Sequence, residues 1–543
     1  MRQARLLPYS VATRGRVCAI INKMRKTIVL MILDGWGEGE KNESNPIYTA
    51  NPKIINSLKY SYPCGLLQAS GIAVGLPWNE EGNSEVCHLT LGAGRVIYQN
   101  FPRISLAIKN GSFFQNPVLK GAFSQAKKNN SFVHLIGLLA APSAYVHSAQ
   151  EHLLALIKFG KQEGVNYALH LFTDGRDSPP YSSLEIIKSL GEEVKNIASL
   201  SGRYYAMDRA KHWDRTEKAY RVLIGDSETI ENYEEKIKAI HQRFNDEYVE
   251  PMLLGPLNRG IKDNDSIIFF NFREDRMRQI VEPFVNKSFS EFPIKQFKNL
   301  SIATMINYRN DFKVRVAFSP EEVKNPLAKV LADNSKIQLR LAETEKYAHV
   351  TYFFNNLVEK PFGNEFRILI PSRMDLKPDE HPEMRAEEIT NRLISAIEEK
   401  AFDFILVNYA NPDIIAHTGN YEATKKVVEI IDEVVDKVVK VVLGQNAVLI
   451  LTSDHGNIER MFDPFTGEIE TKHNNNPVLF YLIGKEFQRQ KDKFQAEKEA
   501  KDVIGVLSDV APTILELLGL KKPKEMTGQS LLGYLQLNDW MVK

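Results

Sequence analysis

A recurring unit, in which a short apolar run ends on an acidic or histidine side chain, restricts the fold of this chain more than any other feature. Its copies are residues 27–33 (TIVLMIL) before Asp34, residues 404–408 (FILVN) before Asp413 and His417, and residues 447–452 (AVLILT) before Asp454 and His455. Runs that are almost entirely apolar are typical of strands buried on both faces of a parallel sheet. Because open α/β sheets place their sites at the carboxyl ends of their strands, we expect these side chains along one sheet edge.

Helical patterns accompany these runs. Valine and isoleucine recur at helical spacing over residues 427–439, with charged residues on the other face, so this part of the chain predicts a β-α-β unit. Residues 508–520 (SDVAPTILELLGL) predict a further amphipathic helix, because Ser508 and Asp509 are capping residues and Pro512 falls in the first turn.

The middle of the chain repeats the pattern with arginine at the strand ends. Apolar runs at residues 132–139, 167–172 and 266–272 alternate with helical stretches such as residues 152–158 and 184–194. The side chains at or soon after these runs are His147, Arg176, Asp177, Arg203, Arg209, Arg273 and Arg276. A single surface arginine is usually solvated, but a set of arginines beside strand ends predicts a site for phosphate or carboxylate. We therefore expect a second α/β domain whose ligand is an anion.

The order of the two sets predicts how the domains are connected. Acidic and histidine residues precede and follow the arginine set, which is the order expected when one domain is inserted into another. The predicted boundaries are residues 24–98 and 319–543 for the discontinuous domain and residues 99–318 for the inserted one. Residues 1–23 carry basic but no acidic side chains, so they are either a targeting leader or a mis-assigned start that precedes Met24, and we favour the second.

Charge and cysteine content exclude several classes of protein. The 543 residues carry 69 lysines and arginines against 68 acidic residues, a net charge of +1, which does not indicate a nucleic-acid-binding protein or a polybasic membrane anchor. No apolar run approaches the roughly 18 residues that span a bilayer. Cys18, Cys64 and Cys87 are too few and too scattered for a disulfide framework or a CxxC metal site, so we expect a reducing cytoplasm.

Ser84, in the segment GNSEVCH at residues 82–88, is the candidate nucleophile. A serine hydroxyl needs an activator, and neither a G-x-S-x-G elbow nor an S-x-x-K motif surrounds it. A metal ion that stabilises the alkoxide is then the natural candidate. The alternative interpretation is a Gly-Asn-Ser turn that caps a helix.

Carboxylates and imidazoles at the strand ends would supply the ligands for such an ion. The full set is Asp34, Ser84, Asp413, His417, Asp454, His455 and His473. Asp413 and His417 share one helix face only if their segment is helical, whereas the adjacent Asp454 and His455 can serve two different ions from a loop. The set predicts a two-metal centre for phosphoryl transfer, with Mn²⁺ or Zn²⁺ favoured over Ca²⁺ or Mg²⁺ by the mixed ligands.

Two further residues have open alternatives. Lys346 is either an additional cation near the phosphoryl group or a surface lysine. His147 is either an acid/base of the arginine-rich domain or a hydrogen-bonded loop histidine.

Motifs along most of the chain match one known family. They are LDGWG at residues 33–37, GNSEV at 82–86, LGAGR at 91–95, TDGRD at 173–177, GRYYAMDR at 202–209, FREDRMRQ at 272–279, AETEKYAHVT at 342–351, SDHGN at 453–457 and NPV at 476–478. They occur in collinear order over most of the sequence. The chain therefore resembles the cofactor-independent phosphoglycerate mutases, a family of the alkaline-phosphatase-like superfamily.

The resemblance implies a fold, a reaction and a location. The fold would be α/β, an alkaline-phosphatase-like parallel-sheet sandwich with a second, transferase-like α/β domain inserted for substrate binding. The reaction would interconvert 3-phosphoglycerate and 2-phosphoglycerate in glycolysis and gluconeogenesis through a phosphoserine, with two Mn²⁺ ions or other divalent metals and without 2,3-bisphosphoglycerate. The enzyme would be a cytoplasmic monomer whose partner is its small-molecule substrate and not nucleic acid or a membrane.

Carried over position by position, the resemblance also implies residue roles. Ser84 would be the catalytic nucleophile. One metal would be bound by Asp413, His417 and His473, and the other by Asp34, Ser84, Asp454 and His455. Substrate would be held by Ser84, His147, Arg176, Asp177, Arg203, Arg209, Arg273, Arg276 and Lys346.

Several positions depart from the family pattern. Cys87 replaces a glycine three residues after the nucleophile, Ala416 replaces the glycine before the metal-binding histidine, residues 140–146 (AAPSAYV) differ ahead of His147, and residues 371–384 match loosely. A thiol at position 87 would crowd the loop, bind metal or oxidise. The alternatives are another metal-dependent phosphomutase or phosphohydrolase of the same superfamily, or an inactive phosphoglycerate-binding homologue. The arginine-rich insert argues against a plain phosphatase, which has no need to retain its alcohol.

Overall fold

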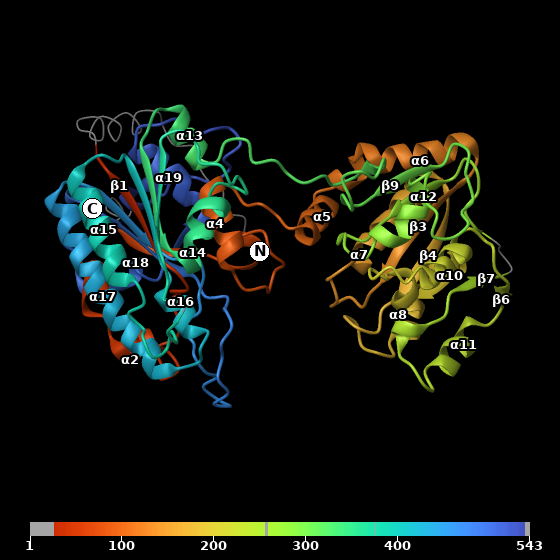
Figure 1. Ribbon diagram of the computed structural model, residues 1–543, viewed down its shortest axis with the longest axis horizontal. Helices are drawn as coiled ribbons and strands as arrows, with labels where there is room; N and C mark the ends of the chain where they lie inside the picture. Colours follow the sequence, from red (N-terminus) through yellow and green to blue (C-terminus); the bar gives the residue numbers. More distant parts are fainter. Residues whose placement is uncertain (1–25, 256–258, 374, 538–543) are drawn as a thin grey trace. The chain divides into compact units, whose positions relative to one another are not determined.

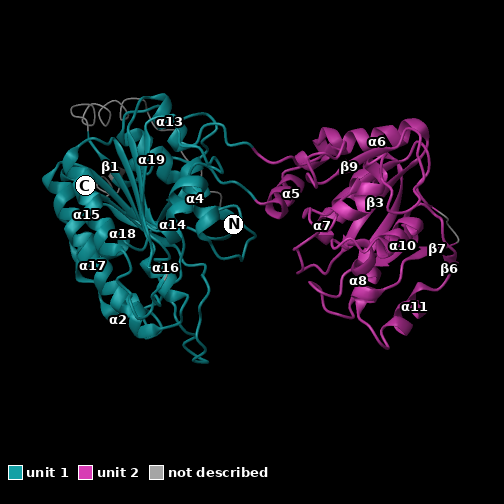
Figure 2. Ribbon diagram, viewed as in Figure 1, with its two compact units in different colours: residues 1–98, 322–543 teal, residues 99–321 magenta. Residues whose placement is uncertain are grey.

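The computed structural model describes residues 26–255, 259–373 and 375–537, which form two compact units (Figure 2). Of the described residues, unit 1 contains 26–98 and 322–537, and unit 2 contains those between 99 and 321. The segment interpreted as a leader or mis-assigned start, residues 1–23, lies outside the described residues. Among the described residues, no helix has both the length and the apolar character needed to cross a membrane.

Unit 1 is built on an eight-stranded sheet in the order β12-β11-β13-β1-β14-β15-β2-β16. The strands are β1 (Ile28–Leu33), β2 (Cys64–Gln68), β11 (Gln338–Glu343), β12 (Glu365–Ile370), β13 (Phe404–Tyr409), β14 (Val448–Thr452), β15 (Val478–Ile483) and β16 (Val503–Val506). Only β15 among these runs antiparallel to its neighbours, β14 and β2. The α/β prediction is confirmed, with the refinement that the sheet is mixed and mostly parallel.

The continuous apolar run of β1 is explained by helices on both faces of the sheet (Figure 1). Val29, Met31 and Leu33 pack in one core with α15 (Ala386–Glu399) and α17 (Tyr421–Gly444). The alternate β1 residues pack in a second core with α4 (Ser84–Ala93), α13 (Leu327–Asp333) and α19 (Val510–Leu517). Unit 1 is therefore a three-layer α/β/α structure in which a central strand has no polar face.

The helices predicted for unit 1 are present, with shifted ends. The valine-rich pattern at residues 427–439 lies inside α17, which extends it in both directions. The segment at residues 508–520 forms a short 3₁₀ helix, Leu507–Asp509, followed by α19. The other helices of unit 1 are α2 (Pro46–Ala50), α3 (Lys53–Leu58), α14 (Thr344–Ala348), α16 (Asn411–Ala416), α18 (Lys493–Glu499) and α20 (Leu532–Leu537).

Unit 2 contains the second sheet, in the order β10-β9-β8-β3-β4-β5-β7-β6. Its strands are β3 (Phe132–Leu139), β4 (Asn166–Thr173), β5 (Ile197–Gly202), β6 (Thr229–Ile230), β7 (Met252–Leu254), β8 (Ser266–Phe269), β9 (Ser301–Thr304) and β10 (Arg315–Val316). Only the β5–β7 pair among them is antiparallel. The predicted second α/β sheet is confirmed, again as a mostly parallel one.

Helices of unit 2 cover this sheet. They are α5 (Asn100–Lys109), α6 (Pro117–Asn129), α7 (Gln150–Glu163), α8 (Ser183–Ser189), α9 (Arg203–Ala206), α10 (Trp213–Leu223), α11 (Tyr233–Ile240) and α12 (Arg278–Val285). The stretch predicted as one helix at residues 184–194 is divided, because α8 ends at Ser189 and a 3₁₀ helix, Gly191–Asn196, follows. Gly191 has a φ of 58°, a left-handed conformation that ends an α-helix.

Candidate active site

Loops at the carboxyl ends of the unit 1 strands carry the predicted metal ligands. Asp34 directly follows β1, and the loop that follows β14 carries Asp454 and His455. After β13 the chain enters α16, which carries Asp413 in its first turn and has His417 at its C-cap. Because this segment is helical, Asp413 and His417, four residues apart, lie on the same face of the helix.

The candidate nucleophile lies in the first turn of α4. Asn83 caps this helix, since its side-chain oxygen accepts a hydrogen bond from the backbone N–H of Val86. The Gly-Asn-Ser capping turn, which was the alternative interpretation of this segment, is therefore present, and Ser84 is the first residue of the helix. Ser84 is buried, and its Oγ lies 2.9 Å from His455 Nε2, 2.7 Å from Lys346 Nζ and 3.2 Å from Asp34 Oδ1.

Lys346, on α14 after β11, is buried in the centre of this group and is not a surface lysine. Its Nζ donates to Asp34 Oδ1 at 2.6 Å and to Asp413 Oδ2 at 2.7 Å, in addition to Ser84. Burial on its own lowers the pKa of Lys346, but the carboxylates around it raise that pKa well above its ordinary value. The side chain is thus a fixed positive charge beside the nucleophile.

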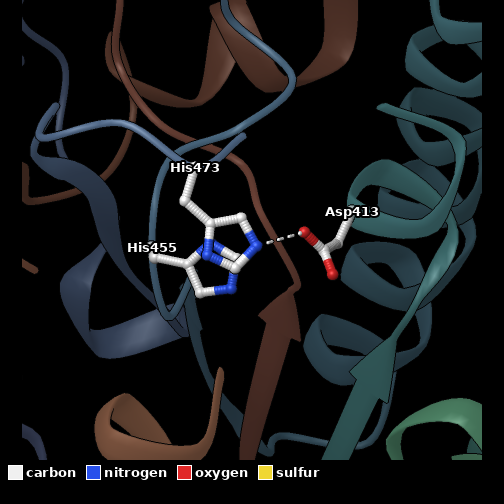
Figure 3. A group of neighbouring side chains, drawn as sticks. All are labelled: Asp413, His455 and His473. Carbon is white, nitrogen blue, oxygen red and sulfur yellow. Dashed lines mark ion pairs between the residues drawn. The ribbon is translucent and has the colours of Figure 1, made fainter. Parts of the chain in front are cut away.

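Two overlapping groups of side chains have the geometry of metal sites. One contains Asp413, His455 and His473 (Figure 3), and the other contains Asp34, Asp454 and His455; within each, the donor atoms lie within 4.8 Å of one another. His417 was expected to join Asp413 and His473, and its Nε2 lies 3.3 Å from Asp413 Oδ1 and 3.1 Å from His473 Nε2. The structure thus brings all the predicted ligands together, with His455 between the two groups.

Hydrogen bonds to the far side of two rings prepare them for coordination. His417 Nδ1 lies 2.7 Å from the Thr471 carbonyl oxygen, and His473 Nδ1 lies 2.8 Å from the Gly82 carbonyl oxygen. A carbonyl only accepts, so each Nδ1 carries the hydrogen and each Nε2 faces Asp413 as a potential ligand. This arrangement, in which the ring is oriented by its outer nitrogen, is usual for metal-binding histidine.

The charge balance of the centre also fits divalent cations. Asp34, Asp413 and Asp454 are buried carboxylates that share a single lysine. Burial and the neighbouring charge of Asp454 raise the pKa of Asp34, whereas the charges of Lys346 and His455 outweigh burial and lower the pKa values of Asp413 and Asp454. Asp454 Oδ2 is buried, and its nearest polar neighbours among the described residues are two imidazole nitrogens, His88 Nδ1 and His455 Nε2, each 3.4 Å away. The centre thus contains more carboxylates than positively charged side chains. A bound Mn²⁺ or Zn²⁺ ion would supply the missing positive charge, and both metals accept carboxylate and imidazole ligands.

Three residues of this centre were not assigned roles from the sequence. Asn408 Nδ2 donates to Asp34 Oδ2 at 2.7 Å, Asn457 Nδ2 donates to Asp413 Oδ1 at 2.8 Å, and His88 Nδ1 lies 2.8 Å from the Ser84 carbonyl oxygen. The sequence position of each residue indicated that it lies near the site: Asn408 ends an apolar run, Asn457 ends the SDHGN segment, and His88 falls one helical turn after Ser84. None of these signals says which ligand the side chain would hold.

Cys87 belongs to neither group of candidate metal ligands among the described residues. The side chain is fully buried in the core between α4 and the sheet, and its Sγ lies 3.6 Å from the Ala69 carbonyl oxygen. Burial and the nearby negative charge of Asp454 raise the pKa of this thiol well above its ordinary value. The sequence departure at this position therefore adds core packing and no new donor atom to the centre.

The arginines of unit 2 gather around a few carboxylates at its strand ends. Arg203, at the start of α9, is buried and binds both Asp174 and Asp177, the second at 2.7 Å. Asp275 holds Arg209 and, at 3.2 Å, Arg273.

The remaining arginines complete a cationic surface. Arg276 Nη1 donates to the Met207 carbonyl oxygen at 3.3 Å, and Arg176 is more loosely held by Glu247, at 3.9 Å. Burial lowers the pKa of Arg276, and the charges of Arg203 and Arg209 lower it further, so these cations lie close enough to repel one another. Such a group would gain stability from a bound anion.

His147 lies at the edge of this arginine group. It is buried, its Nε2 lies 3.8 Å from Asp177 Oδ2, and its Nδ1 has no hydrogen-bond partner among the described residues. Burial and the charge of Arg203 lower the pKa of His147 to about 4, so the ring is neutral at pH 7. The neutral ring has one nitrogen free to accept a hydrogen bond or a proton.

Comparisons with known proteins agree with this site. Residues 26–522 match the model of a metalloenzyme family, the metalloenzyme superfamily. The chain is 44% identical to a 2,3-bisphosphoglycerate-independent phosphoglycerate mutase of Pseudomonas entomophila (strain L48) over 517 residues, which cover 93% of this chain and 98% of that one. It is also 44% identical to 2,3-bisphosphoglycerate-independent phosphoglycerate mutase 1 of Methanosarcina barkeri (strain Fusaro / DSM 804) over 525 residues, 94% of this chain and 99% of that one.

A solved structure is similar over the same length. It is a crystal structure of Leishmania mexicana phosphoglycerate mutase at low cobalt concentration, with a TM-score of 0.50 and 26% sequence identity. The similarity covers 94% of this chain and 98% of that one.

Proposed function

The chain belongs to the metalloenzyme superfamily and within it to the 2,3-bisphosphoglycerate-independent phosphoglycerate mutases, and from this premise we propose that Ser84 carries the phosphoryl group between the two positions of phosphoglycerate. The observation that supports this role is the setting of its hydroxyl. Ser84 Oγ lies within 3.2 Å of Lys346 Nζ, His455 Nε2 and Asp34 Oδ1, in a buried centre of carboxylates and imidazoles. The enzyme is an isomerase, and the phosphoserine is our proposal for its intermediate.

The proposed metals are two Mn²⁺ ions. Asp34, Ser84, Asp454 and His455 would hold one ion, and Asp413, His417 and His473 would hold the other. Bound divalent cations would stabilise the deprotonated serine and neutralise charge on the phosphoryl oxygens. Co²⁺, the metal named with the Leishmania mexicana structure, is the alternative to test first. No 2,3-bisphosphoglycerate is required, because the substrate itself supplies the phosphoryl group.

The proposed role of unit 2 is to retain the glycerate. Substrate carboxylate and hydroxyl groups would be held by Arg273, Arg276, Arg203, Arg209, Arg176, Asp177 and His147. Arg273 and Arg209 are partly exposed and share Asp275, so both retain N–H groups for an anion. Retaining the acceptor makes the return of the phosphoryl group an intramolecular step with a high effective concentration, which excludes competition by water.

The proposed chemistry consists of two displacements at phosphorus. In the first, Ser84 Oγ forms a bond to phosphorus while the bond to the glycerate 3-oxygen breaks, and that oxygen takes a proton. In the second, the glycerate 2-hydroxyl loses a proton and bonds to phosphorus while the bond to Oγ breaks. Asp177 and the neutral His147 are the groups proposed to move these protons, and Lys346 would balance the phosphoryl charge throughout.

The proposed setting is the cytoplasm, with the chain acting as a monomer. Cys64 and Cys87, the cysteines among the described residues, are both free thiols, which is usual for a reducing compartment.

A coupled enolase assay tests the proposed function. Protein stripped with a chelator should not convert 3-phosphoglycerate, and Mn²⁺ should restore turnover without 2,3-bisphosphoglycerate. Acid-quenched enzyme should carry phosphate on the peptide that contains Ser84, and Ser84→Ala should abolish both signals. Full turnover by the stripped protein or by Ser84→Ala would contradict the proposal.

A further inference from the structure

We infer that Asn408 and His88 are positioning residues of this centre, which together hold the Asp34 carboxylate in the orientation that metal binding requires. Neither residue is in the proposed ligand set. The inference rests on the proposed function for its setting, because that function makes Asp34 a metal ligand.

Asn408 supplies the hydrogen bond that orients Asp34. It is fully buried on β13, in register with Ile32 of β1, and its Nδ2 lies 2.7 Å from Asp34 Oδ2 and 3.2 Å from His88 Nε2. A reversed amide would place its oxygen against a carboxylate oxygen at the same distance, so the amide nitrogen must face Asp34. The two N–H groups of Asn408 thus point in two directions, to the carboxylate and to the imidazole.

His88 keeps the amide in that orientation. Its Nδ1 lies 2.8 Å from the Ser84 carbonyl oxygen, which only accepts, so Nδ1 carries the hydrogen and Nε2 is left to accept from Asn408. The amide oxygen of Asn408 is buried without a hydrogen-bond partner among the described residues. An unpaired buried acceptor is unfavourable, so the donated bonds outweigh that cost and define the orientation. The chain of bonds links α4, which carries the nucleophile, to the strand beside Asp34.

The consequence is a difference between the two oxygens of Asp34. Oδ2 receives Asn408, which leaves Oδ1 directed at Lys346 Nζ at 2.6 Å and Ser84 Oγ at 3.2 Å. Without Asn408, Oδ2 loses the donor that holds it, and the contacts of Lys346 and Ser84 at Oδ1 are left to orient the carboxylate. Loss of an outer partner of this kind typically weakens metal binding or activity by roughly 10- to 100-fold.

The first test compares Asn408→Leu with a matched control, Asn355→Leu. Asn355 is also a fully buried asparagine of unit 1 whose Nδ2 donates to a carboxylate, that of Glu365, at 2.9 Å, but it contacts no proposed ligand. Both substitutions should lower the melting temperature. Only Asn408→Leu should weaken one of the two Mn²⁺ binding events, by roughly 10- to 100-fold, when free Mn²⁺ is followed by electron paramagnetic resonance. Equal Mn²⁺ affinities in Asn408→Leu, Asn355→Leu and the wild type would overturn the inference, as would equal weakening of both ions.

The second test separates the two nitrogens of His88 and does not depend on the Asn408 variant folding. In His88→Gln the side-chain amide reaches the position of Nε2 and can still accept from Asn408, whereas in His88→Asn it reaches the position of Nδ1 and cannot. His88→Gln should therefore retain more Mn²⁺ affinity than His88→Asn. The reverse order would overturn the inference, because it would show that His88 acts from its Nδ1 side, on α4 and on Asp454 Oδ2, 3.4 Å away, and not through Asn408.

These measurements also distinguish the inference from the proposed function. If the wild type binds Mn²⁺ but forms no 2-phosphoglycerate, the proposed function fails while the affinity comparison still tests the role of Asn408. If turnover is normal and the Asn408 substitution changes only the melting temperature, the function stands and the inference fails.

Discussion

His417 and His473 present their Nε2 atoms to one oxygen, Asp413 Oδ1, at 3.3 and 3.2 Å. The hydrogen bond to Asp413 raises the pKa of His417. Burial lowers the pKa of His473, but its bond to Asp413 outweighs burial, and the net shift is upward. Both rings therefore keep their extra proton to a higher pH than free histidine does, and that proton must leave before Nε2 can bind a metal.

The upward shift of both histidine pKa values predicts how metal binding depends on pH. Mn²⁺ affinity should fall as pH decreases, and the fall should begin above the ordinary histidine pKa of about 6.5. Each proton released on binding contributes about a tenfold loss per pH unit below the raised pKa. Titration of the wild type and His417→Gln with Mn²⁺ across this range measures it: the variant should bind more weakly and show a shallower slope. A dissociation constant independent of pH would mean that neither imidazole is a ligand.

Substitution of Cys87 should change the stability of the protein but not its turnover or metal content. Cys87→Ala should retain turnover and metal content, because the thiol contacts the Ala69 carbonyl oxygen and no proposed ligand. Cys87→Gly should retain turnover too but lose about 1 kcal/mol more stability than the alanine variant, the usual cost of glycine inside a helix. Melting temperatures and coupled assays with and without a thiol oxidant provide the measurement. A loss of bound metal in Cys87→Ala would make Cys87 a ligand and the interpretation wrong.

The ligands and their supports differ in how far the sequence predicted them. Asp34, Asp454 and His455 follow apolar runs directly, so the rule that sites form at the carboxyl ends of parallel strands was enough to group them. Asn408 and His88 are equally buried, but their roles depend on which atom faces which partner. That information arises only when α4 and β13 meet in three dimensions.

At the scale of elements, the strands were predicted best and the helix ends least well. An apolar run buried on both faces leaves little choice of structure, and β1, β13 and β14 lie within or close to the predicted limits. The division of the helix after α8 was missed, although Gly191 was visible in the sequence. A glycine inside a helical pattern is tolerated in many helices, and only its left-handed conformation, a φ of 58°, shows that the helix ends there.

A chain of buried polar groups across β3, β4 and β5 leads to a prediction about acid stability. His134 Nδ1 lies 2.9 Å from His170 Nε2 and His134 Nε2 lies 3.0 Å from Asp265 Oδ2, while His170 Nδ1 lies 2.8 Å from Ser199 Oγ. Burial, followed by the charge of His134, lowers the pKa of His170 well below its ordinary value. The unfolded chain therefore takes up a proton below about pH 6.5 that the folded chain does not, and stability falls as pH decreases.

The test is His170→Gln, which removes the titrating ring. The variant should be less stable than the wild type at neutral pH, by about 1–3 kcal/mol, because the hydrogen bonds of the ring are lost. Between neutral and acidic pH the variant should lose less stability than the wild type does, by up to about 1.4 kcal/mol per pH unit. Melting temperatures of both proteins at neutral and mildly acidic pH give the comparison. Parallel losses in the two proteins would show that His170 titrates alike in the folded and unfolded states.

At the scale of the whole molecule, the two sets of candidate site residues lie in two compact units. Their order along the chain predicted an insertion, because residues that share a sheet edge can be far apart in sequence. The sequence did not predict that β15 runs antiparallel within the first sheet, since a strand buried on both faces shows the same apolar run in either direction. Nor did it show that Asp275 holds two of the arginines, which leaves the group only partly neutralised.

The proposed division of labour between the units can be tested by following two products. If Ser84 and its neighbours make and break the phosphoserine while unit 2 retains the glycerate, removing an arginine should impair the return step more than the first step. Loss of one charge-assisted hydrogen bond costs about 1.5–3 kcal/mol, or roughly ten- to hundred-fold in retention. Water would then compete for the phosphoserine, so Arg273→Ala or Arg276→Ala should lower mutase turnover and raise the ratio of free phosphate to 2-phosphoglycerate.

Arg309→Ala is the matched control for this experiment, because Arg309 lies in the same unit but pairs with Glu282 and Asp311 and not with the predicted substrate-binding residues. It should leave the product ratio unchanged, and Ser84→Ala should abolish both products. Both are measured in one incubation with 3-phosphoglycerate. If Arg273→Ala and Arg276→Ala reduce free phosphate and 2-phosphoglycerate in equal proportion, these arginines serve the chemical step or the fold, because a residue that only retains the glycerate cannot slow the first displacement as much as the second.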